Sequence, residues 1–264
     1  MIRLVHMLRR KPGMSPKDFC DYWRNIHGPL AASHQRTLAI RRYTQCLRDL
    51  AGSGDDGGAP ARAARGGMAE PFDGVAEFWF ASEAAMVAAL STDEGLAASE
   101  ALIADEARFI DLPHSPFWLA QEHPQVSTQH LPPVAGPRSS IVKLHFPIHQ
   151  LSALSVADAQ RYWLLEHGPL VRSYAAARGM IWYHQVHRYE TEVMAPMRQR
   201  RGTLDDAFIG HAEAWFDRSI PRLGPETEAA SLAALEDERN FIDWSRSSAW
   251  LSKEAVFVDR SGFD

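Results

Sequence analysis

Two histidines are the residues best suited to chemistry, because each stands at the same point of a repeated motif. Residues 22–30 and 162–170 read YWRNIHGPL and YWLLEHGPL and are identical at six of nine positions. In each copy the histidine, His27 or His167, precedes a Gly-Pro pair that disfavours regular helix. An imidazole with a pKa near ~6.5 is the side chain best able to exchange protons at neutral pH. We therefore predict that both are catalytic acids or bases, with helix capping at the Gly-Pro break as the alternative.

Carboxylates and aromatic rings are expected beside these histidines. Glu77 and Glu213 lie in the middle of apolar segments, where a carboxylate must be paired or must have its pKa raised by burial. We predict that both help to bind substrate, with bonds that only stabilise the fold as the alternative. The other predicted substrate-binding residues come from both halves, and the aromatic ones would serve equally as core: His6, Tyr22, Trp23, Tyr43, Trp79, His145, Tyr162, Trp163, Tyr183 and Trp215.

The elements that must position these residues follow one another in a regular order. Residues 2–8 alternate like a strand, and Ser15-Pro16 begins an amphipathic helix that carries the first motif. Strands are then expected at residues 40–47 and 75–80, followed by two helical segments over residues 82–109 and a short strand at residues 117–119. The order β-α-β-β-α-β is that of a ferredoxin-like unit. Glu77 and Trp79 should share one face of their strand, opposite to Phe78 and its neighbours.

The second half of the chain repeats the first. Residues 210–216 answer residues 74–80 at an offset of 136, and residues 237–243 answer residues 105–111 at an offset of 132. The offset differs between motifs, as expected when loops vary in length while helices and strands are retained. On this alignment His145 is the counterpart of His6. Polar loops are expected in the two remaining stretches, residues 51–70 and residues 191–206.

These observations predict two domains of one kind. Repeat 1 covers residues 1–121, a Pro-rich linker covers residues 122–139, and repeat 2 covers residues 140–264. Each sheet has helices on one face only, so its other face needs a partner. The predicted fold class is therefore α+β, with two ferredoxin-like βαββαβ repeats packed sheet to sheet as an intramolecular pseudo-dimeric α+β barrel. We expect a monomer with an internal pseudo-two-fold axis; further homodimerisation is left open.

Composition excludes several classes of function. The formal net charge is only −5, so we expect no nucleic-acid partner. No apolar run approaches the ~18 residues of a membrane span, and no signal peptide precedes the first expected strand. Cys20 and Cys46 lack the spacing of metal ligands, and no histidine pattern indicates a metal site. We therefore predict a cytoplasmic protein with free thiols, no membrane partner, no metal and no cofactor.

Three motifs together resemble the EthD-domain proteins of the dimeric α+β barrel superfamily. They are Tyr-Trp-x-x-x-His-Gly-Pro-Leu, Asp-Gly-x-Ala-Glu-x-Trp-Phe at residues 73–80, and Asp-Glu-x-x-Phe-Ile-Asp at residues 105–111. The second copy departs from the middle motif, with Ile209-Gly210-His211 in place of Asp-Gly-Val. The resemblance implies the barrel fold and a ligand cleft between helices and sheet in each half. The superfamily also includes cofactor-free monooxygenases, muconolactone isomerases, polyketide cyclases and haem proteins, so the fold does not choose a reaction.

The predicted function is that of a cofactor-independent enzyme acting on a small apolar or aromatic oxygenated compound. An apolar cleft with a few polar groups is the usual form of a small-molecule site. Isomerisation, dehydration, cyclisation or oxygenation would each use a histidine as acid or base. One alternative is a haem-binding protein with a histidine as axial ligand. The other is a non-catalytic small-molecule binder in a catabolic pathway. Whether one or both His-Gly-Pro sites are used is left open.

Overall fold

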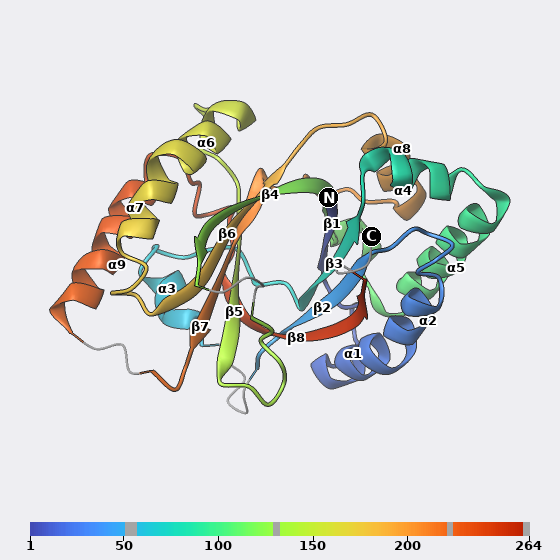
Figure 1. Ribbon diagram of the computed structural model, residues 1–264, viewed down its shortest axis with the longest axis horizontal. Helices are drawn as coiled ribbons and strands as arrows, with labels where there is room; N and C mark the ends of the chain where they lie inside the picture. The colour runs from blue at the N-terminus through green and yellow to red at the C-terminus, as the bar shows by residue number, and fades with distance from the viewer. Residues whose placement is uncertain (51–56, 129–132, 221–223, 261–264) are drawn as a thin grey trace.

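The computed structural model describes residues 1–50, 57–128, 133–220 and 224–260, in which eight strands close into one antiparallel barrel (Figure 1). The strand order is β1-β3-β2-β8-β5-β7-β6-β4. The strands of the first half are β1 (Ile2–Leu8), β2 (Arg42–Arg48), β3 (Gly74–Phe80) and β4 (Phe117–Ser127). Those of the second half are β5 (Ile141–Ile148), β6 (Met180–Arg188), β7 (Gly210–Asp217) and β8 (Trp250–Asp259). The predicted fold class, a pseudo-dimeric α+β barrel, is confirmed.

The barrel closes because the last strand of each half pairs with the other half. β4 lies between β1 of its own half and β6, and β8 lies between β5 and β2. The linker was therefore predicted too long. Residues 122–127 belong to β4 and pair with β6, and the backbone N–H of Ala135 donates to the carboxylate of Glu254 on β8. The remaining linker residues 129–132 lie outside the described part of the chain.

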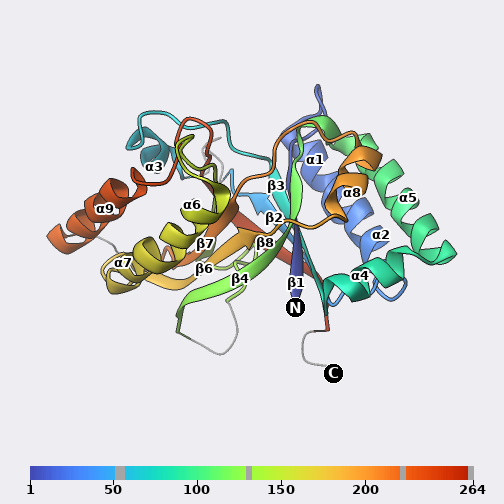
Figure 2. The ribbon, with the colours of Figure 1, turned by 90° about the horizontal axis from the view of Figure 1, so that it is seen from above.

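Helices cover the outside of the barrel on two opposite flanks (Figure 2). The first flank carries α1 (Pro16–Tyr22), α2 (Gly28–Ser33), α4 (Glu83–Leu90) and α5 (Asp93–Phe109), and the second carries α6 (Val156–Tyr162), α7 (Gly168–Ser173) and α9 (Pro225–Glu238). A short 3-10 helix, η2 (Leu112–His114), follows α5. Each flank encloses a hydrophobic core against the outward residues of its strands, such as Phe78 and Ala214. No helix among the described residues is long and apolar enough to cross a membrane.

Two short helices stand where polar loops were predicted. α3 (Ala59–Ala63) lies in the connection between β2 and β3, and α8 (Met194–Arg201) lies in the equivalent connection between β6 and β7. Each crosses to the flank of the other half: α8 lies among the helices of the first half and α3 beside α9 of the second (Figures 1 and 2). The prediction of loops was wrong here for residues 59–63 and 194–201, and residues 51–56 lie outside the described part.

The His-Gly-Pro motif forms a π-helical turn instead of breaking its helix. The turns η1 (Trp23–His27) and η3 (Trp163–His167) continue directly into α2 and α7. Pro cannot donate a hydrogen bond, and its ring needs room near the carbonyl four residues before it. The wider turn provides that room, and the N–H of Gly28 bonds to the carbonyl of Trp23, five residues back. Sequence reasoning located this irregularity correctly but expected an end or a kink.

Candidate functional site

The predicted site residues fall into two groups on opposite sides of the barrel wall. Glu77 and Trp79 point into the barrel, while Phe78 between them faces the helices, as expected from strand alternation. The inner group also contains His145, Glu213 and Trp215. The outer group of the first half is His6, Tyr22, Trp23, His27 and Tyr43, and that of the second is Tyr162, Trp163, His167 and Tyr183. The two groups therefore do not form one site.

His27 is buried and is held by a carboxylate that was not predicted. Its Nδ1 lies 2.8 Å from Oδ2 of Asp105, whose Oδ1 accepts a hydrogen bond of 2.7 Å from the hydroxyl of Tyr22. An ionised Asp105 fixes the proton of His27 on Nδ1. Asp105 opens the repeated Asp-Glu motif, so the sequence carried a signal for a role, but not for its partner.

The same triad occurs in the second half. His167 Nδ1 lies 2.7 Å from Oδ2 of Asp237, and Tyr162 donates to Oδ1 of that carboxylate over 2.7 Å. The bond from His167 is the main reason why the pKa of Asp237 lies below its usual value. In both halves the triad ties the helix that carries the motif to the long helix of its flank, α5 or α9. A structural role explains these contacts.

Tyr43 and Tyr183 are core residues in this structure. The ring of Tyr43 stacks on Phe78 with centroids 4.3 Å apart, and its hydroxyl accepts a 2.9 Å bond from Gln45. Burial raises the pKa of Tyr183 to about 12, although bonds from Trp163 and Gln185 oppose this. Both phenols are fully enclosed, so neither is placed to touch a ligand in the cavity described next.

A mostly apolar cavity, here called the first cleft, lies between the outer face of the barrel and the helices of the first flank. About 60 Å³ of it is open to the centre of a water molecule. Because a water needs ~10–15 Å³ in this measure, the cavity has room for roughly five waters. Its polar side chains are His6, Ser99, Glu106 and Arg201, and apolar residues such as Ile40, Phe80 and Met197 form the rest of the wall.

His6 has a free nitrogen in this cleft. Its Nε2 is buried and has no hydrogen-bond partner among the described residues. Burial lowers the pKa of His6 to about 4, with a contribution from Arg201, while Glu106 and a backbone hydrogen bond of Ser115 act in the opposite direction. The imidazole is therefore neutral at pH 7. A buried polar atom without a partner is costly, and it suits a site that a ligand completes.

Glu106 and Arg201 form an ion pair at the edge of the cleft. Nε of Arg201 donates to Oε2 of Glu106 over 2.9 Å, and Nη2 donates to Oε1 over 3.3 Å. Burial raises the pKa of Glu106, but Arg201, His6 and His27 outweigh it and leave the pKa below its usual value. Arg201 belongs to α8, so the second half of the chain completes the cleft of the first. Neither residue was predicted.

The second half keeps the ion pair but lacks the histidine. Arg65, which follows α3, donates to both carboxylate oxygens of Glu238 over 2.6 and 2.7 Å. Phe146 stands where His6 stands in the first half, because Phe146 pairs with Ala212 as His6 pairs with Ala76. The predicted match of His145 with His6 was therefore wrong by one residue. A one-residue shift turns a side chain to the other face of a strand, and His145 points into the barrel.

Inside the barrel, four charged residues at equivalent positions of the two halves form one network. Arg3 donates to Glu77 and to Glu213, and Lys143 lies 2.9 Å from Glu77 Oε2 and 2.7 Å from Glu213 Oε1. Two further carboxylates complete it: Glu122 accepts from Arg3 over 2.9 Å, and Glu254 lies 3.3 Å from Lys143. The network joins the two halves. Arg3 and Lys143 match at an offset of 140, but nothing in the sequence set them apart from other surface-type cations.

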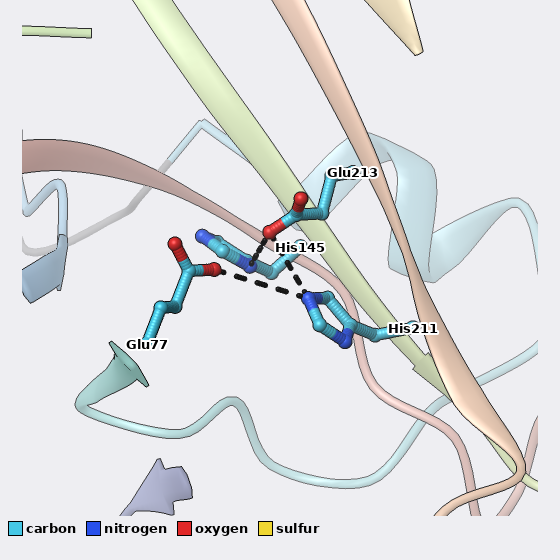
Figure 3. A group of neighbouring side chains, drawn as sticks. All are labelled: Glu77, His145, His211 and Glu213. Atoms are coloured by element: carbon cyan, nitrogen blue, oxygen red, sulfur yellow. Dashed lines mark hydrogen bonds and ion pairs between the residues drawn. The ribbon is translucent and has the colours of Figure 1, made fainter. Parts of the chain in front are cut away.

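The donor set Glu77, His145, His211 and Glu213 could in principle hold a metal ion (Figure 3). One atom of each lies within 4.8 Å of all the others, and neither ring nitrogen of His145 has a hydrogen-bond partner in the described residues. However, Nη2 of Arg3 contacts both carboxylates and lies 3.4 Å from Nε2 of His211. A metal would share these oxygens with two cations at close range. We therefore interpret the cluster as a buried ion-pair network.

The two central carboxylates of this network differ in charge state. Burial raises the pKa of Glu77 to about 8, and the nearby Glu213 adds to this, against Arg3 and Lys143. Burial acts in the same direction on Glu213, but Arg3, Lys143 and a 3.0 Å bond with His211 hold its pKa well below the usual value. Two carboxylates this close favour sharing one proton, and Glu77 is the one that carries it.

Solved structures resemble this chain only at low sequence identity. A "putative monooxygenase" from Lactobacillus acidophilus NCFM has a TM-score of 0.46 and 10% identity, covering 98% of this chain and 96% of its own. Another from Fusobacterium nucleatum subsp. nucleatum has a TM-score of 0.49 and 4% identity, covering 97% and 93%. A "putative chlorite dismutase" has a TM-score of 0.45 and 11% identity, covering 99% and 98%. The comparison with curated proteins finds no match.

A family model gives a more specific result. The model described as EthD domain matches residues 11–113 and residues 152–245. Both matches contain the His-Gly-Pro turn and the aspartate that binds its histidine, and together they cover most of the chain. The chain therefore belongs to the EthD domain family and carries one such domain in each half.

Proposed function

We propose that the first cleft binds a small apolar or aromatic compound through a hydroxyl or enol group, and that His6 exchanges a proton with it. The observation that carries this proposal is the buried Nε2 of His6, which faces an apolar cavity without a partner. A neutral imidazole can accept the proton of a bound hydroxyl. The resulting phenolate or enolate is a common first intermediate of isomerisation, cyclisation and oxygenation, so the proposal names the first step and leaves the later ones open.

His27 has a different part in this proposal. Its Nδ1 is engaged by Asp105, and its ring packs on Phe109 with centroids 5.1 Å apart. It contributes to the charge environment of His6 and holds the motif helix in place. Its counterpart His167 stands in a half that has Phe146 instead of a cleft histidine. We therefore assign proton exchange to His6 and a positioning role to His27 and His167.

The test compares ligand binding by the wild-type protein and a His6→Phe variant, since the second half carries phenylalanine at this position. Phenol, 1-naphthol and cyclohexane-1,3-dione are suitable probes, together with toluene as a probe without a hydroxyl. Calorimetry should show binding of a hydroxyl probe to wild type, and a loss of about tenfold or more in His6→Phe. The lost hydrogen bond of a buried partner corresponds to about 1–3 kcal/mol.

Two controls give this experiment its meaning. His145→Phe changes a histidine inside the barrel and should leave the affinity unchanged. Toluene should bind His6→Phe no more weakly than wild type, because it makes no bond to the imidazole. Equal affinity of wild type and His6→Phe for every hydroxyl probe would overturn the assignment of His6.

The haem alternative fits this cleft poorly. Room for roughly five waters is far less than a porphyrin needs, and the Nδ1 atoms of both motif histidines are occupied by aspartates. A non-catalytic binder differs from an enzyme only in turnover. Proton exchange is measurable by NMR as deuterium uptake next to the carbonyl of cyclohexanone. Uptake that depends on His6 supports an enzyme, and tight binding without uptake supports a binder.

A further inference from the structure

The first cleft is closed by a segment that belongs to the other half of the chain. α8 lies on the flank of the first half, beside α4 (Figures 1 and 2). Met194 of α8 is buried in the core of that flank, and Met197 and Arg201 form part of the cavity wall. Removing α8 would open the cleft to solvent, so access to His6 depends on this helix.

The segment that carries α8 is fastened mainly by polar contacts near its two ends. Before α8, Tyr189 and Thr191 donate to the carboxylate of Glu83 over 3.0 and 2.6 Å. After α8, the backbone N–H groups of Leu204 and Asp205 bond to the carbonyl of Pro113 over 2.9 and 3.2 Å. The helix itself contributes the Arg201–Glu106 pair. Polar anchors of this kind exchange with water at modest cost, which suits a segment that opens and closes.

We propose that α8 is the lid of the first cleft and that Arg201 is a positioning residue that makes His6 a neutral base when the lid is closed. This rests on the proposed function, in which His6 is the group that exchanges a proton. It adds a coupling between closure of the lid and the charge of that group.

The coupling follows from the charges that surround His6. Glu106 on α5 favours the imidazolium form, Arg201 on α8 and His27 on η1 oppose it, and the backbone of Ser115 favours it. In the closed state Arg201 binds Glu106, and the imidazole is buried and neutral. When α8 lifts, Arg201 leaves, water enters and the carboxylate of Glu106 is left without its cation. His6 then gains a proton from solvent, and closure of the lid over a ligand releases it again.

The second half provides an internal comparison. The segment that carries α3 crosses in the opposite direction and places Arg65 on Glu238 over Phe146, with the guanidinium carbon 5.1 Å from the ring centroid. This is the same ion pair in the same place, but without a histidine to influence. Removal of Arg65 therefore matches the removal of Arg201 in structural terms and has no effect on His6.

The experiment is a titration of the histidine resonances of the full-length chain by NMR, with His6→Phe identifying the signal of His6. In wild type His6 should remain neutral down to about pH 5, in the range where a folded protein is generally most stable. Arg201→Gln should raise the pKa of His6 by about one unit or more, and Glu106→Gln should lower it. Arg201→Lys keeps the charge and should restore most of the wild-type value, and Arg65→Gln should change nothing.

A second measurement reports the lid itself. Hydrogen exchange of the backbone amides in residues 194–205 should become faster in Arg201→Gln than in wild type, while Arg65→Gln leaves this segment unchanged. An unchanged pKa of His6 in both Arg201→Gln and Glu106→Gln would overturn the coupling, and unchanged exchange would overturn the lid. Neither measurement needs a ligand. A failure of all hydroxyl probes to bind would therefore count against the proposed function alone.

Discussion

Three histidines near the first cleft show how neighbours decide what an imidazole can do. The Nδ1 of His27 is used by Asp105, and both nitrogens of His145 lie inside the barrel without a partner in the described residues. Only His6 combines a free nitrogen with a cavity. Burial keeps its pKa near 4, so at neutral pH it accepts protons and does not carry a charge into an apolar site.

The two central glutamates of the barrel should respond differently to neutralisation. Glu77 binds a proton in the folded state up to about pH 8, whereas an unfolded glutamate loses it near pH ~4.3. The folded state therefore holds more protons than the unfolded state across this window, and stability falls as the pH rises through it. Glu77→Gln removes this titration, so its free energy of unfolding should depend less on pH between about 5 and 8 than that of wild type.

Glu213→Gln is the matched variant. It takes the ionised partner away from Arg3, Lys143 and His211 and should cost about 3–5 kcal/mol, the typical loss for breaking a buried pair. Urea unfolding at several pH values measures both effects. If Glu77→Gln proved as destabilising as Glu213→Gln at pH 7, both glutamates would be ionised and the assignment of the proton to Glu77 would be wrong.

At the scale of elements, the π-helical turns need glycine because the helix lies directly on other side chains there. A methyl group on Gly28 would overlap the ring of Phe257 and lie 2.9 Å from Nε2 of Gln45. A methyl group on Gly168 would lie 2.7 Å from Oε1 of Gln125. Overpacking of this kind costs about 1–3 kcal/mol, so Gly28→Ala and Gly168→Ala should both lower the free energy of unfolding.

Gly136→Ala is the control for these variants, since nothing lies within 4 Å of an added methyl group at that position. Thermal and urea unfolding should show little change for it. A stability of Gly28→Ala equal to that of Gly136→Ala would mean that Phe257 moves away freely and that close packing is not the reason for glycine in the motif.

Much of this arrangement could be read from the sequence, because the repeat reveals which elements recur. The strands, the motif helices and the alternation of Phe78 with Glu77 follow from local periodicity. The register of β5 could not be fixed in this way: His145 and Phe146 are adjacent, and the choice between them decides which side of the barrel a histidine faces. Pairing with β7 settles it, and that is a long-range contact.

The crossing segments were equally hard to predict. α8 contains four charged or polar residues in succession at its end, Arg198 to Arg201, which is typical of a loop. It is helical because Met194 and Met197 find an apolar partner on the other half, and nothing local specifies that partner. The pair Arg65–Glu238 repeats Arg201–Glu106 at offsets of 136 and 132, so the repeat contained a signal that only the structure makes legible.

At the scale of the whole molecule, the two halves depend on each other. Two strand pairs, two crossing helices and the network around Arg3 and Lys143 all join them. One hydrophobic cluster inside the barrel draws residues from both, including Trp118 and Trp250. A unit joined in this way should unfold in a single cooperative step although the sequence consists of two repeats.

The final prediction tests this cooperativity with two symmetric lesions. Asp105→Asn weakens the triad of the first half and Asp237→Asn that of the second, and each removes an ionised acceptor from a histidine and a tyrosine. Each should cost about 1–3 kcal/mol. Because unfolding is shared, either lesion should shift the urea midpoint of the first-half and the second-half signals equally, as followed by NMR resonances of His27 and His167 or their neighbours. A shift confined to the half that carries the lesion would mean that the halves unfold separately and that the shared strands, helices and ion pairs do not couple them.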